Sequence, residues 1–304
     1  MTGRIIGTGS YVPELAWDNN KLKEYMDTND EWIRERTGIV RRHISVDKST
    51  SEMAVCAAKR AVEGFDVEQI DAIFVCSVTP DVTVPCIACE VQKEIGAVNA
   101  FCYDLNAACS GFVFAYNMAV SYMNTGMIKT ALIIGSERLS GIVDWSDRGT
   151  GILFGDGAGA VLVTACEGPS GMVMHSEGES SDALYCGVGK KLSMDGQKVF
   201  RFAVKRVPEV IRELFDQMHI TKDDVDLFLL HQANIRIIDS VVKRLDLDMD
   251  KVPTNIAEMG NTSSASLGIL LDELNRKGVL KSGSRMIIAG FGAGLSWGAG
   301  YITI

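Results

Sequence analysis

A cysteine in a short turn of small residues is the strongest candidate for a reactive group. Cys109 lies in the segment Asn106–Gly111, which follows an expected strand at 101–105 and leads into an expected apolar helix at 112–123. The free amide groups and the positive dipole end at a helix N-terminus favour a thiolate. The same amides can stabilise an oxyanion during acyl transfer. The sequence therefore predicts a nucleophile at Cys109, although any one of eight cysteines also fits plain core packing.

A thiol nucleophile works with an imidazole, and the chain offers one well-placed histidine. Of the four histidines, His231 alone follows a fully apolar strand, Leu227–Leu230, at the kind of strand end where α/β proteins bind ligands. Asn261 lies in another polar turn that opens into a helix, Gly260–Ser264. Each residue taken alone also fits a structural role. Together they predict a site made by Cys109, His231 and Asn261.

An internal repeat relates the segments that carry these residues. Three pairs share one offset of 155 residues: Asp71 with Asp226, each followed by an apolar run; Gly135 with Gly290, each preceded by one; and Asn106 with Asn261. The repeat predicts that the turns of Asn261 and Cys109 face each other across a pseudo-twofold axis.

Each half is expected to contain, in chain order, a strand, a helix, a strand, a helix and a strand. The strands are continuously apolar, which is typical of α/β sheets covered on both faces. A turn-rich segment at 165–171 is the expected junction. We therefore expect an N-terminal half, 1–166, that carries the cysteine, and a C-terminal half, 167–304, that carries the histidine and asparagine. Because the helix at 112–123 is apolar nearly all round, the halves should pack as one body around it.

Composition narrows the class of protein. The chain has 304 residues, 47% hydrophobic and 23% charged, which is the soluble globular average. No apolar run is long enough for a membrane helix and no signal peptide is visible, so we expect a cytoplasmic protein with reduced cysteines and no membrane partner. The net charge of −9 disfavours nucleic acid, and any anionic partner must find a local basic patch.

Motifs for metals and nucleotides are incomplete. Cys86 and Cys89 have no second pair for zinc, and the acidic run at 246–250 lacks the glycine and glutamate of a calcium loop. The glycine-rich segment 155–159 lacks a phosphate-loop lysine and is expected to be a tight, packed turn. The loop Gly290–Gly294 is not a dinucleotide fingerprint, because no helix with a downstream ribose-binding acid follows it. Its glycines would instead let the backbone approach a ligand closely. We expect no metal and no tightly bound cofactor.

Over essentially its whole length the chain resembles the β-ketoacyl-[acyl-carrier-protein] synthase III family. The motifs that carry the resemblance are Asp30–Ile33, Arg36–Ile39, Ala107–Phe112, Asp147–Thr150, Phe154–Gly159, His231–Asn234 and Gly260–Ser263. The resemblance implies a thiolase-like α/β fold of five layers, αβαβα, built from two duplicated halves that each contain a mixed β-sheet. It also implies a homodimer.

The resemblance further implies an acyltransferase of fatty acid synthesis. Cys109 would take an acyl group from acyl-CoA and release CoA, with the backbone amides of Cys109 and Ala293 as the oxyanion hole. His231 and Asn261 would then hold the thioester carbonyl of malonyl-acyl-carrier protein during decarboxylation. The resulting carbanion would attack the acyl-Cys109 and give a 3-oxoacyl-acyl-carrier protein, with CO2 released. A neutral imidazole would serve this step best.

Substrate contacts are expected from the same resemblance. Thr28, Trp32 and Arg36 are spaced by four, so a helix over 27–36 would put them on one face, where the family stacks the adenine of CoA between Trp32 and Arg148. Further residues match the pantetheine tunnel (Gly196, Phe200, Ala233, Asn234) and the acyl pocket (Val84, Phe291). A basic stripe of Arg201, Arg236, Lys243 and Arg244 is the expected docking surface for an acidic carrier protein.

Two departures from the family pattern bear on specificity. Val84 stands where some relatives have a phenylalanine that reaches into the partner subunit's acyl pocket, so a longer or branched primer could fit. Ala293 replaces a common glycine, which requires backbone angles that suit a Cβ. A primer acyltransferase, an aryl or polyketide condensing enzyme on the same scaffold, a noncatalytic thioester-binding protein and a cysteine hydrolase remain the alternatives.

Overall fold

The computed structural model describes all 304 residues. The strands are β1 (Thr2–Tyr11), β2 (Ala16–Asp18), β3 (Arg41–His43), β4 (Ala72–Cys76), β5 (Phe101–Leu105), β6 (Thr130–Glu137), β7 (Gly157–Cys166), β8 (Met172–Ser176), β9 (Leu184–Tyr185), β10 (Ser193–Met194), β11 (Leu227–Leu230), β12 (Arg285–Gly292) and β13 (Ser296–Thr303). The helices are α1 (Asp30–Thr37), α2 (Thr50–Ala61), α3 (Ile87–Ile95), α4 (Gly111–Asn124), α5 (Gly196–Met218), α6 (Ile235–Leu245), α7 (Ile256–Met259) and α8 (Ser266–Arg276). None of these helices combines the length and the apolar character that crossing a bilayer requires.

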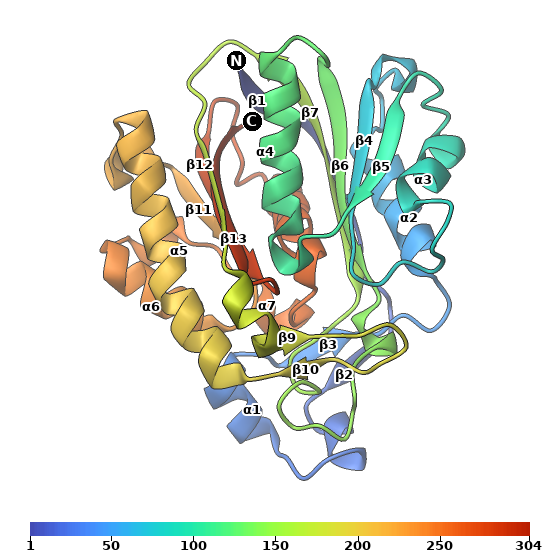
Figure 1. Ribbon diagram of the computed structural model, residues 1–304, viewed down its shortest axis with the longest axis vertical. Coiled ribbons are helices and arrows are strands. Elements are labelled where there is room, and N and C mark those ends of the chain that lie inside the picture. Colours follow the sequence, from blue (N-terminus) through green and yellow to red (C-terminus); the bar gives the residue numbers. More distant parts are fainter.

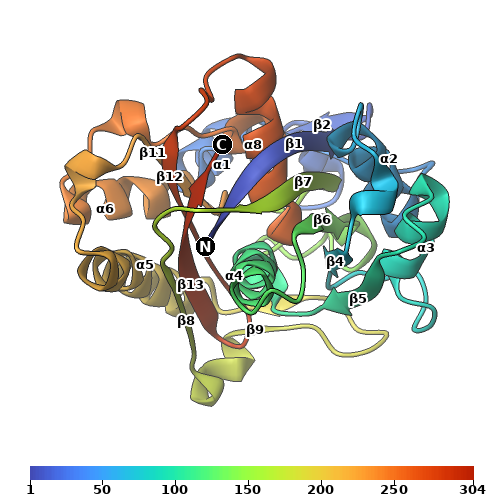
Figure 2. The ribbon, with the colours of Figure 1, turned by 90° about the horizontal axis from the view of Figure 1, so that it is seen from above.

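Nine hydrogen-bonded strands form the body of the molecule and divide into two mixed parts, each called a sheet below. One has the strand order β1-β7-β6-β4-β5, and the other consists of β8, β13, β12 and β11. A single parallel pairing, Arg4 with Thr303, joins β1 to β13. Seen from above, α4 and α8 lie between the sheets, α2 and α3 cover the outer face of the first sheet, and α5 and α6 cover that of the second (Figure 2). The layers are therefore αβαβα, as the family resemblance implied.

Alternation along the buried strands explains this layering. In β4, Ile73 and Val75 point to the outer core beneath α2 and α3, whereas Phe74 points to the central core around α4 and α8. Both faces are apolar because helices cover both. The central core also holds Phe112 and Tyr116 of α4, which are fully buried. The apolar helix expected between the layers is thus confirmed.

The repeat extends further than the sequence analysis suggested. β4, β6 and α4 of the first half begin 155 residues before β11, β12 and α8 of the second. The first half has the expected order, β4-α3-β5-α4-β6, whereas the second half departs from it, because the helices α6 and α7 lie between β11 and α8 with no strand among them. The segment 167–171 links β7 to β8, and the division into two halves at 166 stays a prediction.

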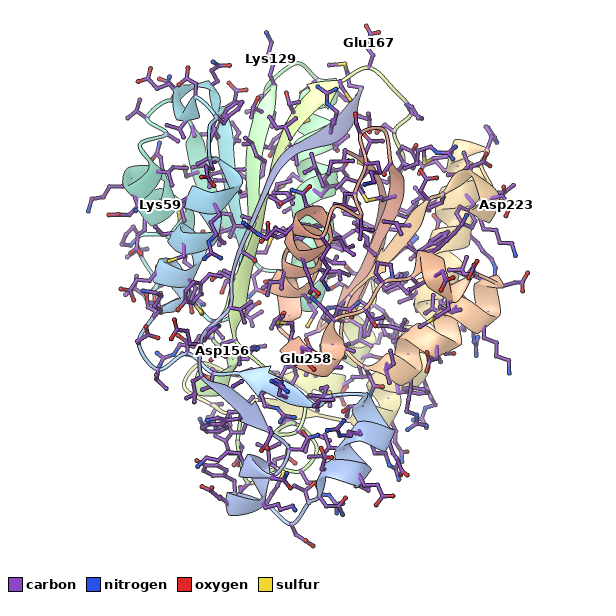
Figure 3. The ribbon with its side chains drawn as sticks, turned by 180° about the vertical axis from the view of Figure 1, so that it is seen from behind. Lys59, Lys129, Asp156, Glu167, Asp223 and Glu258 are labelled. Carbon is purple, nitrogen blue, oxygen red and sulfur yellow. The ribbon has the colours of Figure 1, made fainter.

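A smaller cap closes the end of the body opposite the two termini. It contains β2, α1 and β3, with the β9–β10 hairpin beside them (Figure 1). The fully buried Arg42 of β3 donates to the carbonyl of Ile152 at 2.9 Å and to Oδ1 of Asn19 at 2.8 Å. From behind, Asp156 and Glu258 mark the junction of cap and body (Figure 3), where Arg41 pairs with Glu258 at 3.0 Å.

The glycine-rich segment 155–159 packs closely, as expected. A Cβ on Gly159 would lie 2.3 Å from the backbone of Gly268, so β7 and α8 are in direct backbone contact there. The buried Asp156 carboxylate accepts hydrogen bonds from the backbone amides of Ser45 and Ser140, both at 2.8 Å. The segment therefore fastens the cap to the body.

Candidate active site

The three side chains predicted to work together line one pocket beneath the cap. Cys109 comes from the first half, whereas His231 and Asn261 come from the second, and the pocket has a volume of about 250 Å³. All three are largely buried, with exposures of 8%, 3% and 5% respectively. Twelve of the 21 lining residues are hydrophobic, which suits a chain of carbon atoms ending in a polar group.

Cys109 lies in a 3-10 turn, Ala108–Ser110, that runs directly into α4. Ala108 has a φ of 47°, and Asn106 Oδ1 accepts from its amide at 3.2 Å, which gives the strand-to-helix turn its sharp bend. Burial raises the pKa of Cys109 to about 12, although a hydrogen bond with Ser263 lowers it. Desolvation of the sulfur thus opposes the thiolate that the helix N-terminus favours.

The glycine loop after β12 approaches the cysteine turn itself. A Cβ on Gly292 would lie 2.7 Å from the amide nitrogen of Cys109. Ala293 is not among the residues with a positive φ, whereas the following Gly294 has a φ of 139°. The substitution of the usual glycine by alanine at 293 is thus free of backbone strain. Ala293 lies just beyond the pocket lining, and its part in an oxyanion hole stays a prediction.

His231 is fixed immediately after β11. Its amide donates to the carbonyl of Ala289 in β12 at 2.8 Å, and its ring packs edge-on to Phe291 with centroids 5.4 Å apart. Nδ1 is 2.7 Å from Oγ of Ser266, the first residue of α8, which leaves Nε2 for a ligand. Burial lowers the pKa of His231 to about 3, so the imidazole is neutral at physiological pH.

Asn261 is oriented by its own turn. Its Oδ1 accepts from the amide of Ser263 at 2.8 Å, so the Nδ2 group is the part available to a ligand. Its backbone pairs with the segment Leu153–Gly155 through two hydrogen bonds of 2.9 Å and 3.0 Å. The site therefore offers an amide donor and an imidazole in the same pocket as Cys109.

Two functional neighbours were not identified from the sequence. Ser266 holds the imidazole, and Glu137, at the end of β6, holds the turn that follows Asn261. The fully buried Glu137 carboxylate accepts hydrogen bonds from Ser263 Oγ, Ser264 Oγ, Thr79 Oγ1, Ser77 Oγ and the amide of Val78, between 2.8 Å and 3.3 Å. A carboxylate that ends a fully buried strand is the signal that could have pointed to Glu137.

The outer part of the pocket carries an aromatic ring and a guanidinium. The Arg148 guanidinium lies 3.8 Å from the centre of the Trp32 ring, and that of Arg36 lies 5.7 Å away. The helix predicted over 27–36 is α1, Asp30–Thr37, and begins after the capping residue Asn29. Thr28 is therefore outside the helix and outside the pocket lining, so the predicted shared face holds only for Trp32 and Arg36.

The residues expected along the pantetheine tunnel all line the pocket. Gly196 and Phe200 come from the first turns of α5, and Ala233 and Asn234 precede α6. The side chain of Asn234 is already engaged, because Nδ2 donates to the carbonyl of Arg36 at 3.0 Å and Oδ1 caps α6. Apolar neighbours such as Met194 and Val199 also line the pocket, and no sequence motif marks them.

The two residues expected at the acyl pocket lie apart. Phe291 lines the pocket beside His231, whereas Val84 is outside the lining and 79% exposed. The four basic residues expected to dock a carrier protein, Arg201, Arg236, Lys243 and Arg244, are exposed on α5 and α6. Arg236 lies over the ring of Phe200 at 5.5 Å, so this basic surface reaches the rim of the pocket.

Comparison with known proteins agrees with this geometry. A family model described as 3-oxoacyl-[acyl-carrier-protein] synthase III, C terminal, matches residues 215–304, and a second described as 3-oxoacyl-[acyl-carrier-protein] synthase III matches residues 103–181. A β-ketoacyl-[acyl-carrier-protein] synthase III of Clostridium acetobutylicum is 45% identical over 97% of this chain and 96% of its own length.

Solved structures give the same result. A 3-oxoacyl-[acyl-carrier-protein] synthase III from Aquifex aeolicus is 39% identical with a TM-score of 0.95, covering 98% of this chain and 99% of that one. The priming β-ketosynthase of the R1128 polyketide pathway is 35% identical, also with a TM-score of 0.95, over 100% and 96% of the two chains. The expected thiolase-like fold is thereby confirmed.

Proposed function

Since this chain belongs to the β-ketoacyl-[acyl-carrier-protein] synthase III family, and is thus an acyltransferase that performs the initiating condensation of fatty acid synthesis, we propose that Cys109, His231 and Asn261 divide its two half-reactions. Cys109 accepts the acyl group from acyl-CoA. His231 and Asn261 then activate malonyl-acyl-carrier protein for the condensation. The observation that carries this proposal is the presence of all three side chains, from both halves of the chain, in one apolar pocket.

Acylation requires the sulfur of Cys109 to lose its proton. Because burial favours both the neutral thiol and the neutral imidazole, the proton leaves as the sulfur bonds to the thioester carbon. In the tautomer whose Nδ1–H donates to Ser266, Nε2 of His231 accepts this proton and returns it to the sulfur of departing CoA. The amides of Cys109 and Ala293 stabilise the oxyanion; the close approach of Gly292 to Cys109 supports this role.

Condensation needs hydrogen-bond donors rather than a strong base. In the other tautomer, Ser266 donates to Nδ1, and Nε2–H donates to the malonyl thioester carbonyl together with Nδ2 of Asn261. Two neutral donors stabilise the enolate formed when CO2 leaves, and its carbon then attacks the acyl carbon on Cys109. The bond between that carbon and the sulfur breaks, and the departing Cys109 thiolate takes up a proton from solvent. A pKa of about 3 keeps His231 in this neutral form throughout the physiological range.

Recognition of CoA is assigned to the outer pocket. Trp32 and Arg148 stack on each other at 3.8 Å, so an adenine ring would enter by displacing the Arg148 side chain and would lie between the two planes. Arg148 is exposed and free to move in this way. The half-buried Trp32 is the fixed partner, since the ends of α1 are held by Asn29 and by the left-handed Gly38.

The carrier protein is assigned to the basic surface on α5 and α6. Its rim position, with Arg236 over Phe200, suits delivery of a pantetheine arm into the pocket. Charge reversal at Lys243 and Arg244 is expected to raise the Michaelis constant for malonyl-carrier protein by about tenfold or more while leaving acylation by acyl-CoA unchanged. An unchanged Michaelis constant would remove the docking assignment.

A homodimer is assigned to the edge of the first sheet. β5 is an edge strand, and Phe101 and Tyr103 on it are only half buried, with Tyr122 of α4 packed beside them. Val84, which is 79% exposed, lies near the same edge before α3. An apolar edge of this kind fits a second copy of the chain. Sedimentation of the protein tests the assignment, and a monomer at micromolar concentration would contradict it.

One relative supports a second candidate function. The similarity to a priming β-ketosynthase of polyketide synthesis leaves open that the condensation starts a specialised metabolite instead. Mass spectrometry of the protein mixed with straight, branched and aryl acyl-CoA species separates the two. We expect an acyl mass on Cys109 that malonyl-acyl-carrier protein removes. A thiol that no acyl-CoA modifies would contradict the proposed function, and preference for an aryl primer would favour the second candidate.

A further inference from the structure

A pair of buried serines joins the two segments that meet at the catalytic cysteine. Ser110 ends the 3-10 turn of Cys109, and Ser296 is the first residue of β13. Their hydroxyl oxygens are 2.7 Å apart, although the residues are 186 positions apart in the sequence. Their exposures are 0% and 5%, and neither residue lines the pocket. Any role of the pair in the reaction must therefore pass through the groups that the two hydroxyls hold.

The two hydroxyls form a hydrogen-bonded chain between two carbonyl groups. Ser110 Oγ lies 2.6 Å from the carbonyl oxygen of Ala107, and Ser296 Oγ lies 3.0 Å from that of Ala293. Each hydroxyl has one proton to donate. In one arrangement Ser110 donates to Ala107 and accepts from Ser296. In the other, Ser110 donates to Ser296, which donates to Ala293. Both arrangements keep the bond between the serines, so it connects the turn of Cys109 to the loop after β12.

The same two segments carry the amides assigned to the oxyanion. The amide of Ala293 donates to no other residue of the chain. The amide of Cys109 is directed at its own sulfur, with which it forms a hydrogen bond. A Cβ on Gly292 would lie 2.7 Å from the nitrogen of this amide, so the two segments meet closely. Backbone amides that converge on one point are a common form of oxyanion hole. The serine pair thus connects the carriers of both amides.

The serine bond is the pocket end of a longer contact between α4 and β13, which lie side by side in the interior (Figure 2). Further along, Tyr116 Oη donates to the carbonyl of Tyr301 at 2.9 Å, and Asn117 Nδ2 donates to that of Ala299 at 3.2 Å. These bonds hold the helix to the strand without the serines. Loss of a serine hydroxyl should therefore loosen the pocket end and leave the fold intact.

The other copy of this arrangement in the chain lacks the hydroxyls. The residue 155 positions after Ser110 is Ala265. The counterpart of Ser296 is Gly157, because β7 pairs with β6 as β13 pairs with β12, and these two residues begin the corresponding strands. A requirement of the fold alone would apply to both copies. The hydroxyl pair is present only at the turn that carries the nucleophile.

We propose that Ser110 and Ser296 are positioning residues that fix the spacing between the two amides of the oxyanion hole. The inference rests on the proposed function, because the amides of Cys109 and Ala293 are assigned to the oxyanion there. Negative charge develops on the thioester oxygen only as the sulfur bonds to the carbon beside it. A hole of fixed geometry therefore stabilises the transition state more than the bound substrate. The serines should affect the rate of acylation and not the binding of acyl-CoA.

Single-turnover acylation of the whole protein by acetyl-CoA and by isobutyryl-CoA tests the proposal. Ser110→Ala and Ser296→Ala should each slow transfer to Cys109 about tenfold at saturating acyl-CoA, with the half-saturating concentration changed less than about twofold. Both variants should fold, since the remaining hydroxyl keeps a carbonyl partner in each. The double variant should be no slower than either single variant, because one substitution already breaks the connection.

Alkylation by iodoacetamide separates positioning from general damage to the pocket. This reagent reacts with the same sulfur by displacement of iodide, and no oxyanion forms. Both variants should therefore be alkylated at Cys109 at the native rate, as read by peptide mapping. Ser121→Ala is the matched control. It removes another hydroxyl of α4, which donates to the carbonyl of Asn117 at 2.9 Å, and should change neither reaction.

Four results would overturn the proposal. These are acylation of either serine variant at the native rate, alkylation slowed by the same factor as acylation, effects that multiply in the double variant, and equal slowing of acylation by Ser121→Ala. A native protein that no acyl-CoA modifies would instead contradict the proposed function, so the two failures are distinguishable.

Discussion

The two halves of the chain build the same turn twice, but only the turn of the first half carries a nucleophilic cysteine. Ala108 and Ser263, 155 residues apart, have φ angles of 47° and 50°, and each begins a 3-10 turn that runs into a central helix. Asn106 and Asn261 hold these turns in the same way, accepting from the amide two residues later at 3.2 Å and 2.8 Å. The repeat has therefore copied the backbone and its local hydrogen bond.

The side chains in front of the two turns differ. At the catalytic turn, Gly292 leaves room beside Cys109. The residue 155 positions earlier is Glu137, whose carboxylate fills the equivalent space and accepts from Ser263 and from Ser264, the counterpart of Cys109. The duplicated fold thus creates two equivalent spaces, one in front of the Cys109 turn and one in front of the Ser264 turn, which are called niches below. A glycine keeps one open, and a glutamate seals the other.

A second pair of side-chain differences distinguishes the two niches. The counterpart of His231 is Cys76, a fully buried thiol at the end of β4. The counterpart of Ser266 is Gly111, and a Cβ there would lie 3.0 Å from Cys76. The imidazole and the hydroxyl that orients it therefore exist only in the second half. Catalysis depends on a few side-chain differences between two copies of one scaffold.

The largest expected effect comes from the nucleophile and its counterpart. Cys109→Ala should abolish the acyl mass and reduce condensation by at least about 10³-fold, because no other group can carry the acyl chain. Ser264→Ala should keep the chemistry but remove one of the two donors to Glu137 Oε1 and the side-chain donor to the Cys76 carbonyl, at a cost of about 1 kcal/mol in unfolding free energy. Mass spectrometry and urea unfolding measure the two effects. Loss of acylation in Ser264→Ala at unchanged stability would mean that the sealed niche takes part in the chemistry.

The two asparagines provide the next test. Both substitutions by alanine remove the same turn hydrogen bond, but only Asn261 also faces the pocket. Asn261→Ala should slow condensation by about 10²- to 10³-fold while Cys109 acylation stays largely intact. Asn106→Ala should lower stability by about 1 kcal/mol with little change in either rate. Single-turnover acylation and steady-state condensation separate these outcomes, and equal loss of both half-reactions in Asn261→Ala would contradict the division of labour.

The sequence predicted the layers and the catalytic set because both depend on local signals. Apolar strands, a small-residue turn before Cys109 and a polar switch at His231 can each be recognised without knowing the fold. The repeat then supplied the spatial relation between the turns. The start of α1 was misplaced because Asn29, rather than the four-residue spacing from Thr28, sets where the helix begins.

What the sequence could not predict are properties of the assembled interior. The position of Cys109 at a helix start can be read from the sequence, whereas the burial that raises its pKa to about 12 comes from residues far apart in the chain. Ser266 and Glu137 are ordinary helix-start and strand-end residues until His231 and Ser263 pack against them. Their roles depend on contacts between the halves, which no motif within one half reveals.

The orienting hydroxyl should have a smaller effect than the groups that touch substrate. A hydroxyl donates and accepts, so Ser266 holds the His231 ring in either tautomer. Ser266→Ala removes this hold and should slow condensation roughly tenfold, as loss of an orienting partner typically does. Ser266→Thr keeps the hydroxyl and should recover most of the rate. If the threonine variant is as slow as the alanine variant although both fold, packing at this position, rather than the hydrogen bond, matters.

The smallest effect on activity, and the clearest on stability, is expected at the residue that seals the second niche. Burial raises the pKa of Glu137 above its ordinary value of 4.5, so the folded protein holds this proton more tightly than the unfolded chain does. Stability should therefore fall as pH rises from about 4.5 through the folded-state pKa, and the loss should persist above it.

Glu137→Gln keeps an acceptor oxygen but cannot ionise. The unfolding free energy of this variant minus that of the native chain should increase with pH by about 1.4 kcal/mol for each unit by which the pKa is raised. Urea unfolding between about pH 4 and pH 8 measures the difference, in which contributions from other carboxylates cancel. A difference that does not change with pH would mean that the five hydrogen bonds fully offset burial of the charge. The sealed niche would then hold an ionised carboxylate at no cost in stability.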